Sequence, residues 1–143
     1  MSFLNSLNIS GSALTAQKLR MDIISQNIAN AKTTRTPEGG PYIKKSVVFR
    51  PSEEQVSFKG ILRNTQGIRG VEVTEIIENP NATIPVYDPS HPDADQNGYV
   101  MMPNINTVEE MIDMMSATRS IEANIAAFNS LIQMANRALE IGR

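Results

Sequence analysis

Polar residues between Asp88 and Asn104 form the one cluster in this sequence whose residue types and spacing suggest chemistry. His91 is the single histidine, and three carboxylates, Asp88, Asp93 and Asp95, lie close to it in the chain. A histidine among carboxylates could bind a divalent metal or act as a general base. The sequence offers no cysteine and no second histidine as a partner. A metal-dependent enzyme centred on His91 is therefore kept as an alternative, while we predict no catalytic residue, no cofactor and no metal site.

The same cluster resembles part of a calcium-binding loop. Residues 93–98, Asp-Ala-Asp-Gln-Asn-Gly, match the first six positions of an EF-hand loop. Position twelve is Asn104, where the loop needs a bidentate glutamate, and Pro89 and Pro92 prevent a preceding helix. We therefore predict a polar turn that leads into a strand at Tyr99.

Apolar residues recur at alternating spacings of three and four near both ends of the chain. This period is typical of helices that pack side by side as in a coiled coil. All eight prolines lie from Pro37 to Pro103, so none interrupts either pattern. The predicted assembly seam comprises Leu7, Ser10, Leu14, Gln17, Met21, Ile24, Ile28 and Ala31 in the first pattern, and Met111, Met114, Thr118, Ile121, Ile125, Phe128, Ile132, Ala135 and Leu139 in the second.

The boundaries of the two helices follow from local signals. The first helix begins within the first few residues and runs to about Ala31, before a β-branched pair and Pro37. Asn106 or Thr107 can cap the second helix, and Thr107 with Glu110 matches a capping box. Gly142 marks its C-terminal end.

The segment between the helices is predicted to be a small, loop-rich β insert. Its expected strands are 42–49, 55–62, 71–77, 83–87 and 99–102. The predicted fold class is mainly α with a small β insert, in which the long terminal helices pack as a coiled-coil-like pair. The expected organisation is an N-terminal assembly helix (1–34), a β-rich insert (35–103) and a C-terminal assembly helix (104–143).

Composition narrows the classes of function. The chain has 143 residues, a net charge of −2 and no cysteine, which excludes a disulfide framework. It has no apolar run long enough to span a membrane and no visible cleavable signal peptide. Residues 35–69 carry seven Lys/Arg and three Asp/Glu, whereas residues 70–118 carry nine Asp/Glu and no Lys or Arg. Nucleic acid is a poor candidate partner, and the two stretches are either solvated surfaces or pair between subunits.

The helices carry more apolar surface than one shared seam can cover. Further apolar residues lie off the seam: Ile9, Leu19, Ile23, Ile112, Met115, Leu131 and Met134. A helix that is apolar over so wide an arc expects more than one neighbour. Because only two long helices are predicted, the remaining neighbours are expected to come from other chains.

Several segments carry a resemblance to a known family. The N-terminal motif Ser25–Thr34 contains Asn27, Ile28, Ala29, Asn30 and Thr33, and the C-terminal helix contains Glu122, Ala123 and Asn124. These segments resemble the bacterial flagellar basal-body rod and hook family, and residues 35–42 and 86–106 resemble a proximal-rod member of it. Ile121 stands where the family usually has tyrosine, and residues 52–70 have no match.

The resemblance implies a structural subunit of the flagellar proximal rod. Such subunits assemble into a hollow helical shaft that transmits torque, in the periplasmic part of the basal body. The resemblance also implies export through the flagellar type III apparatus without a cleaved signal peptide. The implied partners are copies of the same chain, other rod proteins and the export apparatus, with no nucleic acid and no membrane insertion. A cytoplasmic coiled-coil adaptor is the rival interpretation.

Overall fold

The computed structural model describes residues 3–52, 69–79 and 81–142. Along the chain, the described residues form a long helix, then four strands, then a second long helix. The elements are α1 (Phe3–Ala29), β1 (Lys45–Pro51), β2 (Val71–Glu78), β3 (Thr83–Tyr87), β4 (Tyr99–Pro103) and α3 (Thr107–Ile141). The predicted fold class, mainly α with a small β insert, is confirmed. The predicted strand 55–62 lies outside the described residues.

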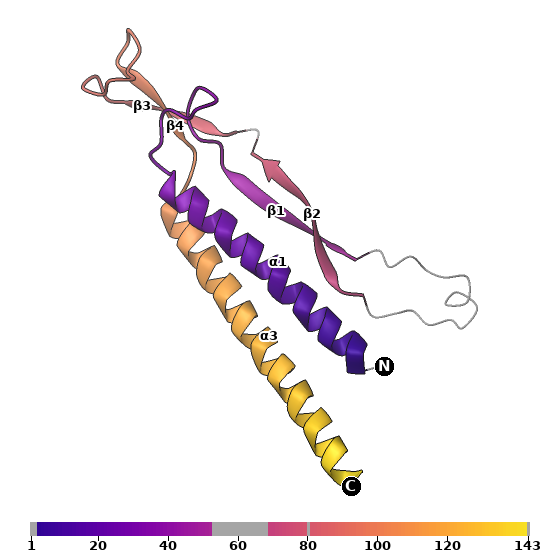
Figure 1. Ribbon diagram of the computed structural model, residues 1–143. Coiled ribbons are helices and arrows are strands. Elements are labelled where there is room, and N and C mark those ends of the chain that lie inside the picture. Colours follow the sequence, from indigo (N-terminus) through magenta and orange to yellow (C-terminus); the bar gives the residue numbers. More distant parts are fainter. Residues whose placement is uncertain (1–2, 53–68, 80, 143) are drawn as a thin grey trace, which may run out of the picture.

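The two helices lie side by side and run in opposite directions (Figure 1). The antiparallel pair β1–β2 lies along α1, and the pair β3–β4 lies beyond the end of the helices, near the start of α3. Among the described helices and strands, α1 contacts α3, β1 and β2, whereas α3 contacts α1 alone. The fold is therefore layered, with α1 in the middle and α3 on the outside.

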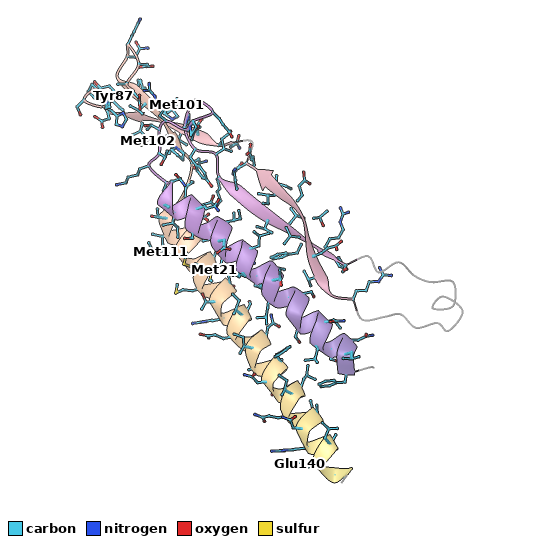
Figure 2. The ribbon with its side chains drawn as sticks, in the orientation of Figure 1. Met21, Tyr87, Met101, Met102, Met111 and Glu140 are labelled. Carbon is cyan, nitrogen blue, oxygen red and sulfur yellow. The ribbon has the colours of Figure 1, made fainter. Side chains whose placement is uncertain are left out.

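The helices differ in length, so one projects past the other. α1 has 27 residues and α3 has 35, which correspond to about 40 Å and about 52 Å at the usual rise. Figure 2 shows Glu140 near the end of α3 that extends past α1. No described helix combines the length and the hydropathy that a membrane span requires.

The start of α3 is capped by Asn106, whose Oδ1 accepts a hydrogen bond from the Val108 N–H at 3.1 Å. The predicted capping box of Thr107 and Glu110 is wrong, because the Glu110 side chain is held by residues of other segments. Gly142 follows the helix, and its N–H donates to the Glu140 carbonyl.

The predicted strands agree closely with the observed ones, except that β1 lies further along the chain than predicted. β2, β3 and β4 match the expected segments to within one residue. β1 begins at Lys45 rather than at Tyr42, because the Tyr42 N–H donates to the Thr33 carbonyl in a loop. A bulge between Val48 and Phe49 shifts the register of β1 against β2.

Few of the described residues are fully buried. The buried apolar residues are Ala16, Ile23, Ile24, Val100, Pro103 and Ala117. Two polar side chains are buried as deeply, Asn27 and Glu110, each 1% exposed. Burying polar groups so deeply is costly unless they are hydrogen-bonded, which points to a built polar contact between the helices.

Candidate functional site

The predicted seam of α1 is covered within the chain. Its eight residues are all buried or half-buried. Met21 belongs to the row Leu7, Leu14, Met21 and Ile28, in which the residues are seven apart. Its sulfur lies 3.7 Å from the Thr118 hydroxyl of α3. That face of α1 therefore packs against α3.

The predicted seam of α3 divides into two rows. One row repeats every seven residues through Met114, Ile121, Phe128 and Ala135, and all four side chains are half-buried. The other row, Met111, Thr118, Ile125, Ile132 and Leu139, is exposed, and its apolar members range from 39% exposure at Ile132 to 73% at Leu139. We call this second row the open row; it is the part of the predicted seam that the chain itself leaves uncovered.

A second uncovered apolar surface lies on α3 close to its start. Val108, Ile112 and Met115 are 62%, 57% and 56% exposed. At 100° per residue these positions lie roughly opposite the buried Ala117. Ile112 and Met115 also line a shallow hollow with Ser116, Arg119, Ser120 and Ala123. The helix is thus apolar on more than the side that α1 covers, as expected for an element with further neighbours.

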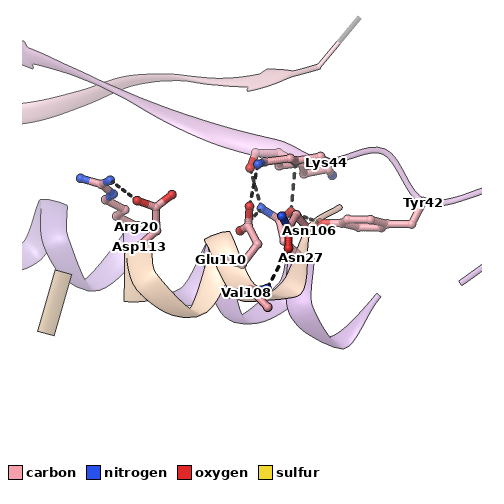
Figure 3. Close-up of polar contacts among 9 residues, drawn as sticks. Arg20, Asn27, Tyr42, Lys44, Asn106, Val108, Glu110 and Asp113 are labelled. Carbon is pink, nitrogen blue, oxygen red and sulfur yellow. Dashed lines mark hydrogen bonds and ion pairs between the residues drawn. The ribbon is translucent and has the colours of Figure 1, made fainter. Parts of the chain in front are cut away.

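Asn27 is the centre of a polar contact between three segments (Figure 3). Its Oδ1 accepts from the Lys45 N–H at 3.1 Å and from the Tyr42 hydroxyl at 3.0 Å. Its Nδ2 donates to the Lys45 carbonyl at 2.9 Å and to Glu110 Oε2 at 3.0 Å. Both acceptor positions and both donors of the amide are therefore satisfied. We call Asn27, Tyr42, Lys44, Lys45 and Glu110 the polar joint.

Glu110 balances its buried charge within this joint. Its Oε1 lies 2.7 Å from Lys44 Nζ. Burial raises the pKa of the Tyr42 hydroxyl, and the negative charges of Glu110 and Glu78 raise it further. The neutral phenol therefore remains a hydrogen-bond donor to Asn27. The sequence gave Glu110 a capping role, whereas the structure buries its carboxylate against Asn27 and Lys44.

The other motif residues lie away from the joint. The Asn30 amide donates to the Gln26 carbonyl, and Thr33 Oγ1 donates to Asn30 Oδ1, so this pair completes the end of α1. Ile28 is half-buried and Ala29 is exposed. On α3, Glu122 and Ala123 are exposed and Asn124 is half-buried, more than ten residues along the helix from Glu110. The structure therefore does not bring the two motifs together.

The side chains around His91 form turn hydrogen bonds. His91 Nδ1 accepts from the Asp93 N–H at 3.1 Å, and Asp93 Oδ2 accepts from the Thr34 hydroxyl at 2.9 Å. Asp95 Oδ1 accepts from the N–H groups of Asn97 and Tyr99. The predicted polar turn before Tyr99 is confirmed by these bonds. Within residues 3–52, 69–79 and 81–142, no three His, Cys, Asp or Glu side chains are placed to hold a metal ion.

Asp88 belongs to the same turn region. Hydrogen bonds from the Ser90 hydroxyl at 2.6 Å and from the Ser90 N–H at 3.1 Å lower the pKa of the Asp88 carboxyl. A carboxylate stabilised as an anion in this way is a poor proton donor or base at neutral pH.

Ion pairs connect the basic and acidic stretches within one chain. Lys44 pairs with Glu110, Lys45 with Glu78 at 3.9 Å, and Arg35 with Asp93 at 3.4 Å. Lys44 is largely buried in its pair, whereas Arg35 and Glu78 are exposed. Only the Lys44 pair is shielded enough from water to contribute strongly.

Two protein-family models match this chain. The family model described as "Flagella basal body rod protein" matches residues 7–35, and that described as "Flagellar basal body rod FlgEFG protein C-terminal" matches residues 96–141. The first match thus contains α1 except for its first four residues, and the second contains the whole of α3.

Full-length relatives carry one name. The chain is 44% identical to the "Flagellar basal-body rod protein FlgC" of Borreliella burgdorferi, covering 99% of this chain and 98% of the relative. It is 43% identical to the protein of that name in Bacillus subtilis and 40% identical to that in Salmonella typhimurium, each over 100% of both chains. This chain therefore belongs to the FlgC family of flagellar basal-body rod proteins.

Proposed function

We propose that this chain is a structural subunit of the flagellar basal-body rod, which assembles with copies of itself and with other rod proteins through α3. The observation that supports the assembly surface is the open row. An apolar row in register with a packed seam, yet exposed in one chain, is the pattern of a helix that receives a further helix.

The energetics favour covering this surface. Full burial of a large apolar side chain stabilises an assembly by about 1.5–3 kcal/mol, and Met111, Ile125 and Leu139 are each about half exposed or more. Contacts between different surfaces of like subunits, repeated at a fixed rotation and rise, generate an open helical array. Subunits joined in this way would build a hollow shaft whose stiffness, rather than any reaction, transmits torque.

The finer parts of the proposal concern location. We propose that the subunit is exported by the flagellar type III apparatus without a cleaved signal peptide and takes its place in the periplasmic rod. Partners other than rod proteins and the export apparatus, including nucleic acid, are not part of this proposal. A cytoplasmic adaptor would instead remain with the cytoplasmic fraction and leave motility intact when deleted.

The test places a carboxylate in each row of α3. Ile125→Asp puts a charge in the open row, so it should abolish rod assembly and motility in a complemented deletion strain while the purified subunit keeps its helical content. Phe128→Asp puts the charge against α1 and should also lower the stability of the isolated subunit. Gln96→Glu, in the exposed β3–β4 turn, adds the same charge as a control and should assemble normally.

The readouts are swimming, recovery of the subunit in isolated basal bodies, and circular dichroism of the purified variants. Normal rods containing the Ile125→Asp variant would contradict the proposed assembly surface. His91→Ala should leave motility nearly intact; loss of motility at a normal protein level would instead support a chemical role for that histidine.

A further inference from the structure

The apolar contacts between α1 and α3 do not define a unique alignment of the two helices. On α1 the row Leu7, Leu14, Met21 and Ile28 repeats every seven residues. On α3 so does the half-buried row Met114, Ile121, Phe128 and Ala135. Sliding α3 by seven residues, about 10.5 Å, would bring Ile125 to the position of Thr118 beside Met21. Along the half-buried row of α3, the displaced alignment again presents apolar side chains to α1, so this row alone allows both alignments.

The polar joint, in contrast, occurs once. Asn27 and Glu110 are separated by 83 residues in the chain, yet their side chains meet at 3.0 Å with both residues buried. Sliding by seven residues would carry the Glu110 carboxylate away from the Asn27 amide and from Lys44 Nζ. A buried charge and an unsatisfied amide would remain, which is the costly outcome for polar groups in an apolar setting.

The joint also fixes α1 to the start of β1. The Asn27 amide bonds both the N–H and the carbonyl of Lys45, as a neighbouring strand would. Lys44, next in the chain, supplies the ammonium that pairs with Glu110. Three segments that are distant in sequence, the end of α1, the beginning of β1 and the first turn of α3, therefore meet at one point.

We propose that Asn27, Lys44 and Glu110 are positioning residues that select the register of α1 against α3. In this role the joint decides which of several apolar alignments the chain adopts, as a single buried polar residue does in coiled coils. The inference concerns the alignment within one subunit and is independent of the proposed rod function.

The absence of cysteine from the sequence makes the register measurable by disulfide cross-linking of introduced pairs. Met21→Cys with Thr118→Cys reports the observed register, since these side chains lie 3.7 Å apart. Met21→Cys with Ile125→Cys and Met21→Cys with Met111→Cys report displacement by seven residues in either direction. Each pair is placed in the full-length chain and oxidised under identical conditions.

The cysteine pairs are compared in the parent and in three variant backgrounds. Glu110→Leu with Lys44→Met removes both members of the joint's buried ion pair together. Arg20→Met with Asp113→Leu is the matched control, because it also removes an ion pair between α1 and α3. The paired atoms of Arg20 and Asp113 are 3.6 Å apart, but both side chains are partly exposed. Glu110→Gln is the conservative variant, which keeps an acceptor for the Asn27 amide.

In the parent and the control, the yield of the Met21–Thr118 cross-link should exceed that of the Met21–Ile125 and Met21–Met111 cross-links by about tenfold or more. The Glu110→Leu/Lys44→Met variant should keep its helical content but lose this preference, and Glu110→Gln should restore most of it. Retention of the native cross-link alone in a folded Glu110→Leu/Lys44→Met variant would overturn the proposal. The short connection Asn104–Asn106 would then set the register.

A second variant decides the question if the first does not fold. Glu110→Ala with Ala117→Glu moves the acid by seven residues along α3. It should shift the dominant cross-link to the Met21–Ile125 pair. An unchanged native cross-link in this relocated variant would also overturn the proposal.

Discussion

α1 and α3 carry the same kind of apolar pattern but have different surroundings. α1 lies between α3 and the β1–β2 pair, and its only strongly exposed large apolar residues are Phe3 and Leu4 in its first turn. α3 has one neighbour among the described elements and exposes nine such residues. These are Val108, Met111, Ile112, Met115, Ile125, Ile132, Met134, Leu139 and Ile141.

The difference teaches that one periodic pattern can serve two purposes. On α1 the pattern builds the subunit, because α3 and the strands cover it. On α3 half of the pattern builds the subunit, and the open row remains for other chains. Substitutions in α1 should therefore reduce the stability of the isolated subunit, whereas equivalent substitutions on the exposed side of α3 should spare it.

The largest effect is expected at the polar joint. Asn27→Ala removes four hydrogen bonds, so Glu110 Oε2, the Tyr42 hydroxyl and the Lys45 backbone N–H and carbonyl all lose the amide as a partner. The free energy of unfolding should fall by about 4 kcal/mol, since each buried group left unsatisfied costs about 1–3 kcal/mol. Asn129→Ala, at an exposed position of α3, is the control and should change it by less than about 0.5 kcal/mol. Urea unfolding of both variants measures the difference; equal midpoints would contradict the role of the joint.

An apolar pair gives the next largest contrast. Ile24 on α1 is 5% exposed and Ile125 on α3 is 46% exposed. Ile24→Ala should lower the stability of the isolated subunit by about 3 kcal/mol because it leaves a cavity. Ile125→Ala should lower it by less than about 1 kcal/mol, since much of that side chain already meets water. Thermal unfolding of the isolated subunits measures both losses of stability. Equal losses for the two variants would contradict the inferred difference in burial between α1 and α3.

A smaller contrast involves hydroxyl groups. Ser12 on α1 accepts a hydrogen bond from the Val71 N–H at 3.1 Å, which attaches the start of β2 to the helix. Ser130 on α3 donates only to the Ala126 carbonyl of its own helix. Ser12→Ala should cost about 1 kcal/mol, whereas Ser130→Ala should be nearly neutral. Denaturant midpoints of the two alanine variants measure the loss of stability. Equal losses would show that the hydrogen bond between Ser12 and Val71 does not stabilise the subunit.

The smallest effect concerns pH. Burial and the charges of Glu110 and Glu78 raise the pKa of Tyr42, so folding favours the neutral phenol. This contribution is complete below the pKa of an unfolded tyrosine, about 10, and is lost as pH rises through the higher pKa of the folded state. The stability difference between the parent and Tyr42→Phe should therefore narrow in alkaline solution. Tyr87→Phe, at the β3–β4 end, is the control; a gap that widens with pH would contradict the assigned sign.

Local patterns were sufficient to predict the helices. The three-four spacing, the prolines confined to 37–103, Asn106 and Gly142 define both helices to within a few residues. Strand β2 was predicted as well, because its alternating valines carry a local signal.

Two features required the three-dimensional arrangement. Glu110 follows another glutamate in the first turn of a helix, where an acid normally complements the helix dipole, so nothing nearby indicated that it would be buried against Asn27. The pattern of α3 also showed that Ile125 and Phe128 are apolar, but not that α1 would leave the first exposed and half-bury the second. Which partner covers an apolar residue depends on contacts between distant segments.

The sequence separation of 83 positions from Asn27 to Glu110 has a consequence for the order of folding. A chain that emerges N-terminus first, from a ribosome or a narrow channel, presents α1 long before α3. β1 and β2 can dock on α1 early, but the long loop closes only when the first turn of α3 is free. Until then Asn27 lacks the Glu110 carboxylate, and the apolar face of α1 that later meets α3 lies bare. Closure of the joint is thus a late event, and the open row, all of which follows Glu110 in the chain, becomes available to a neighbour only after that residue has emerged.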